Sequence, residues 1–255
     1  MYLVPSVRRA VLPALLALPL GLAVRPDALP LMPTRISVLP ANTLWSWERR
    51  EDLRGLDARR FAIAYLDQTL TIDLSLHREA RRNPVMLPSG AVRIPVVRIE
   101  PSRHAVLDAV NREEAVRAIL LSAEEPGIAA LQIDFDATVS ERAFYRDVLA
   151  GVRQGMPAAL PLSITALASW CSYDDWLRGL PVDEAVPMMF RMEPNRRRAP
   201  ADGYDFEIRE PLCRGAVGVS TSEPWPARVH GKRVYVFADE GWRSENLAQL
   251  ERRVR

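Results

Sequence analysis

Two acidic residues, Asp134 and Asp136, end the apolar segment 131–136, whose sequence is LQIDFD. Successive side chains of a β-strand point to opposite faces, so Gln132 and both carboxylates share one face of this strand and the apolar residues share the other. Carboxyl groups at a strand end are candidates for general acid and base catalysis. The spacing therefore predicts a site for acid/base chemistry.

A second apolar segment, 94–99, supplies partners for these acids. The same alternation places Arg98 and Glu100 on its inner face. Because a buried carboxylate needs a compensating cation, we expect Arg98 to pair with Asp134. Glu100 and Asp136 then remain at the ends of neighbouring strands, where their interaction should raise the pKa of one of them and make it a proton donor near neutral pH. We expect Asp136 to be the general acid and Glu100 to be its partner. The alternative is that all four residues form a buried ion-pair layer that only stabilises the fold.

Further polar and aromatic residues follow other predicted strands. Glu223 is a second candidate partner for Asp136. Flat aromatic faces beside carboxylates suit a sugar ring, whose C–H face stacks on them while its hydroxyls form hydrogen bonds. The alternative for each tryptophan is core packing. The expected substrate-binding residues are Trp47, Asp67, Arg98, Trp170, Arg191, Trp225 and Trp242.

The elements that must position these residues are short apolar runs separated by charged, helix-like stretches, a pattern typical of parallel strands joined by crossover helices. We predict a single (β/α)8 TIM-type barrel, with an open doubly wound sheet as the alternative. Against that alternative, the chain has no glycine-rich dinucleotide or phosphate-binding loop. The eight expected strands are Leu44–Trp47, Phe61–Leu66, Ile94–Ile99, Ile128–Phe135, Leu160–Leu167, Ala185–Phe190, Ala216–Ser220 and Val234–Ala238.

Amphipathic stretches predict helices at Arg103–Glu124, at Ser140–Arg153 with Ser140 as the N-cap, and at Glu245–Arg255. The segment Thr71–Val92, which contains prolines and a glycine, is expected to form a hairpin or loop instead. About 215 residues is short for such a barrel, whose usual size is about 250, so some crossovers should be shortened.

The N-terminal region is expected to lie outside the barrel. Basic Arg8 and Arg9 precede an apolar run from Ala10 to Val24, too short to span a bilayer and typical of a signal sequence. We assign 1–24 to a signal peptide or an uncleaved signal anchor, 25–40 to a proline-rich linker and 41–255 to the barrel. A buried helix is the remaining alternative for the apolar run. The expected location is periplasmic or extracellular, with membrane contact only through an uncleaved segment.

Composition excludes several classes of function. The 255 residues include 34 basic and 32 acidic side chains, and a net charge of +2 does not favour nucleic-acid binding. The three histidines, His77, His104 and His230, lack metal-ligand spacing, so neither a metal nor another cofactor is expected. Cys171 follows the fifth predicted strand and Cys213 precedes the seventh, which places them at opposite ends of a barrel. We therefore expect no disulfide between them.

Four segments together resemble an uncharacterised bacterial family, domain of unknown function 3142, with the likeness running from about Trp45 to the C-terminus. The resemblance implies a barrel related to glycoside hydrolases, without an established reaction. The four segments are Leu131–Thr138, Leu160–Cys171, Val182–Met192 and Val217–Trp225.

The chain is also distantly similar to chitinase-like hydrolases, whose fourth strand carries D-x-x-D-x-D-x-E and whose sixth carries M-x-Y-D. In register, the acidic positions hold Ala129, Gln132, Asp134 and Asp136, and the second motif becomes Met188, Phe190 and Arg191. Two acids of the first motif and both the tyrosine and the aspartate of the second are therefore absent, and the terminal glutamate of the first becomes the shorter Asp136. Substrate-assisted catalysis needs a paired acid and a group that holds an N-acetyl substituent, so the likeness does not extend to that mechanism.

These observations lead to two hypotheses. The first is an exported glycoside-hydrolase-like enzyme that acts on a polysaccharide or cell-envelope glycan by carboxylate acid/base catalysis. The second is a catalytically degenerate barrel that binds glycan or an envelope partner without turnover. The sequence leaves the sugar, the linkage, the stereochemical outcome and the oligomeric state open.

Overall fold

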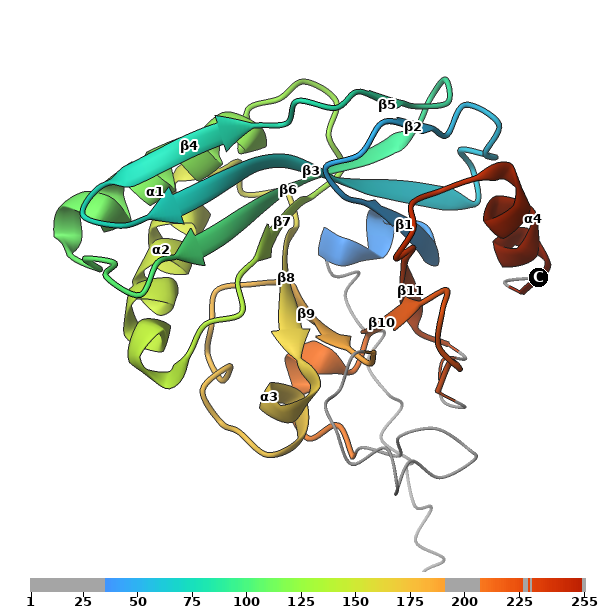
Figure 1. The fold of residues 1–255 in the computed structure, drawn as a ribbon. Helices are drawn as coiled ribbons and strands as arrows, with labels where there is room; N and C mark the ends of the chain where they lie inside the picture. The colour runs from blue at the N-terminus through green and yellow to red at the C-terminus, as the bar shows by residue number, and fades with distance from the viewer. Residues whose placement is uncertain (1–34, 191–206, 227–228, 230, 254–255) are drawn as a thin grey trace, which may run out of the picture. The chain divides into compact units, whose positions relative to one another are not determined.

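The structure is a computed structural model, and it describes residues 35–190, 207–226, 229 and 231–253. In this part of the chain, nine strands form the main sheet (Figure 1). Their bounds are β1 (Asn42–Ser46), β3 (Phe61–Ile72), β4 (Leu76–Ala80), β6 (Val92–Pro101), β7 (Leu131–Asp134), β8 (Leu162–Leu167), β9 (Glu184–Met188), β10 (Ala216–Ser220) and β11 (Arg233–Phe237).

Eight of these strands close into a parallel barrel. The order in the sheet is β1-β11-β10-β9-β8-β7-β6-β3-β4, and β1 pairs in parallel with both β11 and β3. The ring therefore contains every strand of this sheet except β4. Each of the eight predicted strands overlaps one strand of the ring. An open doubly wound sheet is excluded because β1 has a neighbour on both sides.

The segment predicted as a hairpin or loop is largely a hairpin. β3 continues beyond the barrel to Ile72, and β4 returns antiparallel to it. A bulge between Leu66 and Gln68 shifts the register of β3 against β6 at this point. Nearby, β2 (Glu51–Asp52) and β5 (Val85–Met86) form a separate two-stranded sheet.

The described part of the chain has fewer helices than a regular (β/α)8 barrel. α1 (Ala109–Ala123) and α2 (Arg142–Gly155) lie side by side on the outer face of the sheet (Figure 1). α3 (Ala168–Ser172) is a single turn, and α4 (Ser244–Arg253) follows β11. After β1, β3 and β8 the described chain has no helix longer than α3, in agreement with the expected shortened crossovers. The short 3-10 helices are η1 (Arg35–Val38), η2 (Val139–Glu141) and η3 (Pro211–Cys213).

The predicted N-cap at Ser140 is wrong. Residue 140 lies inside η2, a tight turn that leads directly into α2. The backbone N–H of Thr138 donates a 2.6 Å hydrogen bond to Oε2 of Glu141, as in a capping box that starts two residues earlier. The structured turn therefore begins at Thr138, immediately after the candidate acids.

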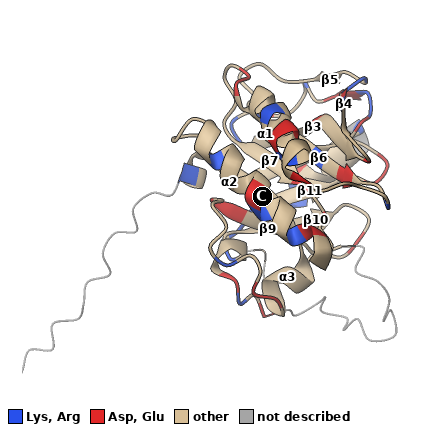
Figure 2. Cartoon of the chain, turned by 90° about the vertical axis from the view of Figure 1, so that its left-hand side faces the viewer, with Lys and Arg blue, Asp and Glu red and all other residues tan. Residues whose placement is uncertain are grey.

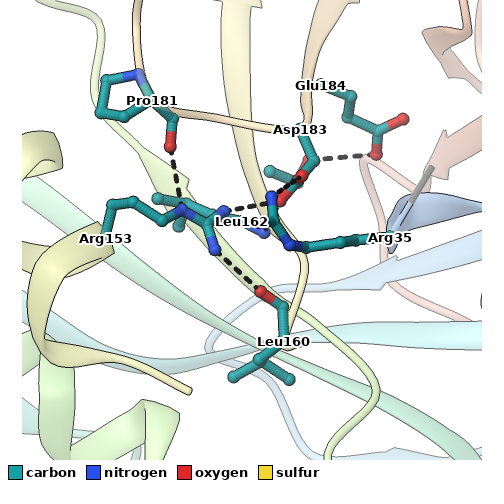
Figure 3. A network of polar contacts seen from close by, with 8 residues as sticks. Arg35, Arg153, Leu160, Leu162, Pro181, Asp183 and Glu184 are labelled. Atoms are coloured by element: carbon teal, nitrogen blue, oxygen red, sulfur yellow. Dashed lines mark hydrogen bonds and ion pairs between the residues drawn. The ribbon is translucent and has the colours of Figure 1, made fainter. Parts of the chain in front are cut away.

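An ionic cluster lies at the N-terminal end of the barrel strands (Figure 3). The Asp183 carboxylate accepts hydrogen bonds from Arg35 at 3.0 Å, from Arg153 at 2.6 Å and from the backbone N–H of Leu162 at 2.8 Å. Ile36 of η1 is buried in the barrel interior beside this cluster. These interactions hold the segment before β1 against the first residues of β8 and β9.

Buried polar side chains cross the middle of the barrel in one chain of hydrogen bonds. Trp45 Nε1 donates to Gln132 Oε1 at 2.7 Å, and Gln132 Nε2 donates to Ser163 Oγ at 3.0 Å. Ser163 Oγ and the Tyr235 hydroxyl donate to Glu184 Oε1 at 3.1 and 2.5 Å. Gln132 therefore points inward as predicted, and its amide is used within the interior.

The expectation for the cysteines is wrong, because Cys171 and Cys213 form a disulfide with a Cα–Cα distance of 5.9 Å. Cys171 lies in α3, which turns outward from the end of β8 into the layer outside the sheet. The backbone N–H groups of Arg209 and Glu210 donate to the Cys171 carbonyl at 2.9 and 3.1 Å, which brings η3 and Cys213 alongside. The prediction failed because a residue that follows a strand end need not stay at that end of the barrel.

Basic and acidic residues are interspersed over the elements of the fold (Figure 2). None of the helices within the described ranges combines the length and the apolar character that a membrane span requires. The apolar run at 10–24 and the proposed linker up to residue 34 lie outside the described residues.

Candidate active site

A pocket of about 540 Å³ opens at the C-terminal end of the barrel strands. This is the end at which TIM-barrel enzymes build their active sites, because the loops after the strands converge there. Its walls come from the ends of β1, β6, β7, β8, β9 and β11. The lining residues are Trp47, Arg49, Arg98, Glu100, Asp134, Asp136, Leu167, Met188, Phe190, Phe237, Ala238 and Asp239.

The predicted ion pair between Arg98 and Asp134 is present on one wall of this pocket. β6 and β7 pair in the register that sets these two residues opposite each other. Arg98 Nη1 donates a 2.5 Å hydrogen bond to Asp134 Oδ2, and Thr165 Oγ1 donates to Asp134 Oδ1 at 2.7 Å. Both oxygens of this buried carboxylate are therefore occupied.

Arg98 also holds Glu100. Its Nε donates to Glu100 Oε1, and the guanidinium lies 5.1 Å from the centre of the Trp47 ring. Burial lowers the pKa of Arg98, but the carboxylates of Asp134 and Glu100 outweigh burial and raise it. Arg98 is a permanent cation that connects two carboxylates and one aromatic face.

Asp136 differs from these neighbours. It follows β7, is exposed in the pocket, and has no hydrogen-bond partner among the described residues. Partial desolvation raises the pKa of Asp136, the charge of Asp134 raises it further, and Arg98 opposes the shift. The sequence predicted that Glu100 would raise the pKa of Asp136. Glu100 pairs with Arg98 instead, and the charge of Asp134 raises this pKa.

The backbone that presents the acids is supported from behind by aromatic packing. Phe135, between Asp134 and Asp136, contacts the buried ring of Tyr145 on α2 at a centroid distance of 4.9 Å. Burial raises the pKa of the Tyr145 hydroxyl, and the charges of both aspartates add to the effect. The rigid apolar face of β7 thus directs its two carboxylates into the pocket.

Three aromatic side chains line the pocket, of which the sequence analysis selected only Trp47. Its ring packs edge-on against Trp45 at 4.5 Å. Phe190 and Phe237 contact each other at 4.9 Å. Met188 also lines the pocket, whereas Met189 is buried. The pocket therefore presents both carboxylates and aromatic faces.

The other three tryptophans proposed for substrate binding lie elsewhere. Trp170 is buried in α3 against Trp176, and Trp242 is buried with its Nε1 donating to the Trp45 carbonyl at 2.9 Å. Trp225 donates to the Ser220 carbonyl at 2.9 Å, and Arg253 of α4 covers its ring. None of these three side chains reaches the pocket, because the chain turns outward soon after the strand that precedes each of them.

Asp67 and Glu223 also lie outside the pocket. Asp67 lies at the bulge of β3, where its Oδ2 accepts a 2.6 Å hydrogen bond from Ser122 of α1. The strand does not end there, so Asp67 faces the helix layer. Glu223 is not a lining residue, and Arg191 lies outside the described residues.

Two charged residues of the pocket were missed by the sequence analysis. Arg49 Nη1 donates to the backbone carbonyl of Asp239 at 2.6 Å. Asp239 Oδ2 accepts hydrogen bonds from Ser220 Oγ at 3.2 Å and from Ser222 Oγ. Both residues follow predicted strands by one or two positions, so extending the strand-end rule would have found them. Within the described ranges, no group of three histidine, cysteine or acidic side chains has the geometry to hold a metal ion.

Comparisons with known proteins were made for sequence and for structure. Among solved structures, the crystal structure of the Bacillus cereus spore cortex-lytic enzyme SleL matches with a TM-score of 0.40 and 17% identity. The match covers 58% of this chain and 41% of the other, and we base no argument on it. The search of curated proteins found no match.

The family comparison matches residues 89–190 to the model described as Domain of unknown function (DUF3142). This range contains the segments 131–138 and 160–171 and most of 182–192, which carried the resemblance in the sequence. The segment 217–225 lies beyond it. Over residues 89–190 the chain is therefore similar to the family described as Domain of unknown function (DUF3142).

Proposed function

We propose that this barrel is a glycoside-hydrolase-like enzyme acting on a polysaccharide or cell-envelope glycan, with Asp136 as general acid. The observation that carries the proposal is the contrast between two aspartates two residues apart. Asp134 is held through both oxygens, whereas Asp136 is exposed, lacks a hydrogen-bond partner in the described structure and has a raised pKa. A carboxyl group with a raised pKa in a pocket is suited to donate a proton near neutral pH.

The form of the pocket supports a sugar as the substrate. Trp47, Phe190 and Phe237 supply apolar faces, and the polar groups of Arg49 and Glu100 lie among them. A sugar ring needs both kinds of surface, because its C–H face stacks on aromatic rings while its hydroxyls need hydrogen-bond partners. The volume of about 540 Å³ falls within the usual range for small-ligand sites.

Release of reducing ends from peptidoglycan, partially deacetylated chitin and a β-glucan tests the proposal. We expect the wild-type protein to cleave at least one of them and Asp136→Asn to lose about 10²–10⁴-fold in rate. Asp52→Asn is the matched control, because Asp52 is an exposed carboxylate outside the pocket that pairs with Arg54. Cleavage of none of the three by the wild-type protein, or an Asp136→Asn rate equal to that of Asp52→Asn, contradicts the proposal.

One observation favours the alternative of a binding barrel without turnover. In the chitinase-like pattern, two of the acidic positions are occupied here by Ala129 and Gln132. The Gln132 amide is committed to Trp45 and Ser163, so it cannot act in place of an acid. Binding to one of the three glycans without release of reducing ends, unchanged in Asp136→Asn, would support this alternative.

We also propose that the chain is exported. The apolar run at 10–24 supports this, and so does the disulfide between Cys171 and Cys213, since disulfides persist mainly in oxidising compartments. Fractionation of cells that express the full chain tests it. Recovery from the cytoplasm with both thiols reduced would contradict the proposal.

A further inference from the structure

We propose that Asp239 is the second catalytic carboxylate of this site, acting as general base opposite Asp136, and that hydrolysis proceeds with inversion at the anomeric carbon. The inference rests on the proposed glycoside-hydrolase function and adds to it a residue and a stereochemical outcome. Three observations carry it: the position of Asp239 in the barrel, the contacts that hold it, and the contacts that occupy the other acids.

The first observation is the position of Asp239 around the ring of strands. Asp136 follows β7 and Asp239 follows β11, and both line the same pocket. From β7 to β11 the ring passes through β8, β9 and β10 in one direction and through β6, β3 and β1 in the other. The two strands are therefore diametrically opposed, and the two carboxylates enter the pocket from facing walls.

The second observation is that Asp239 is fixed in place from both its backbone and its side chain. Its carbonyl accepts the 2.6 Å hydrogen bond from Arg49, and its Oδ2 accepts hydrogen bonds from Ser220 at 3.2 Å and from Ser222. Three residues later in the same loop, the Trp242 N–H donates to the buried Glu51 at 3.0 Å. Preorganisation of this kind is what a catalytic group requires, because it removes the cost of orienting the group during reaction.

The third observation concerns the other carboxylates of the pocket. Asp134 is used by Arg98 and Thr165, and Glu100 is paired with Arg98. Glu100 also lies on β6, directly beside β7, so it shares a wall with Asp136 and cannot act from the opposite side of a bound sugar. Among the residues that the structure describes, Asp239 is the pocket carboxylate that faces Asp136.

This arrangement sets the chemistry. Asp136 transfers its proton to the glycosidic oxygen as the bond from that oxygen to the anomeric carbon breaks. Asp239 takes a proton from a water molecule whose oxygen forms the new bond to the anomeric carbon from the other face. The products are a hemiacetal of inverted configuration and the released alcohol, with Asp136 ionised and Asp239 protonated until solvent exchanges the protons. Inverting enzymes separate their carboxyl groups by about 6.5–9.5 Å to admit that water, against about 5–5.5 Å in retaining enzymes. The placement of Asp136 and Asp239 after diametrically opposed strands favours the wider spacing.

The first test is the anomeric configuration of the product, followed by proton NMR directly after cleavage of whichever of the three glycans the wild-type protein hydrolyses. We expect the inverted anomer to appear first and to mutarotate later. Cleavage with retention overturns the Asp239 assignment and leaves the proposed hydrolase function intact. Absence of cleavage instead removes the proposed function on which the assignment rests, so the two failures are distinguishable.

The second test uses variants of Asp239, with Asp52→Asn as the control. We expect Asp239→Asn to lose about 10²–10⁴-fold in rate and to lose the acidic limb of the pH profile, which reports the base. In Asp239→Ala, added azide should restore turnover and yield a glycosyl azide of inverted configuration. If Asp239→Asn fails to fold, Asp239→Glu keeps the charge and should retain part of the activity. Wild-type rates in folded Asp239→Asn overturn the assignment.

Discussion

The guanidinium of Arg98 and the carboxylate of Asp134 are joined by a 2.5 Å hydrogen bond between Nη1 and Oδ2. Asp134→Asn removes the negative charge from this buried pair, but Arg98 keeps Glu100 as a second partner. We therefore expect a loss of about 1.5–3 kcal/mol in the free energy of unfolding, as for a hydrogen bond to a charged group. Urea unfolding measures it. A loss no larger than that of Asp52→Asn would show that the pair contributes nothing.

Asp136 gives a prediction for the pH dependence of stability. Its pKa is raised in the folded protein, so the folded state binds this proton more tightly than the unfolded state, whose carboxyl pKa is about 3.9. The stability that it contributes is complete below that unfolded value and is lost as the pH rises through the folded pKa. The melting temperature of Asp136→Asn should therefore rise relative to that of the wild-type protein as the pH increases from about 4 to about 7. A difference that shrinks over this range would contradict the raised pKa.

The disulfide predicts a large effect of reduction. Cys171 and Cys213 are 42 residues apart, and a cross-link of that length stabilises the folded state by roughly 4 kcal/mol through the unfolded chain. Cys171→Ser together with Cys213→Ser should lower the midpoint of urea denaturation accordingly. Titration of the denatured, unreduced protein should find no free thiol. Two free thiols per chain would contradict the bridge.

Asp183 at the N-terminal end of the barrel offers a matched pair of variants. Arg153 and Asp183 are nearly buried, with side-chain exposures of 17% and 10%, whereas Arg35 on the same carboxylate is 48% exposed. Asp183→Asn should cost about 3–5 kcal/mol, because it leaves Arg153 without its counter-charge. Arg35→Gln should cost about 1 kcal/mol or less, as an exposed pair does. Equal losses in the two variants would show that burial does not decide the contribution.

Much of the barrel was predictable because its strands are buried on both faces and therefore appear as continuous apolar runs. The same period-two alternation was enough to pair Arg98 with Asp134, since β6 and β7 are adjacent in the ring and unshifted in register at that point. Closure by β1 followed from the count of eight strands. These features depend on local sequence and on nearest neighbours alone.

The errors occurred where the chain leaves a strand. Trp170 and Trp242 follow strand ends but turn into the packed layers, and a strand-end rule carries no information on that turn. Asp67 was misplaced because β3 continues past it to Ile72, so Asp67 does not lie at a strand end, and its side chain contacts α1. Asp239 directly follows the eighth predicted strand, but Trp242 was selected at that strand end in its place. Contacts between loops far apart in sequence are set by packing that no local pattern encodes.

The family match covers residues 89–190, and this range supplies only part of the pocket. Glu100, Asp134 and Asp136 lie within it, whereas Trp47 and Asp239 lie outside it on the facing side. A fragment limited to the matched range would therefore contain one half of the cleft and could not enclose a ligand. A protein that shares only residues 89–190 with this chain shares the proposed acid Asp136 but need not share the proposed base Asp239, so the match alone does not carry over the proposed reaction.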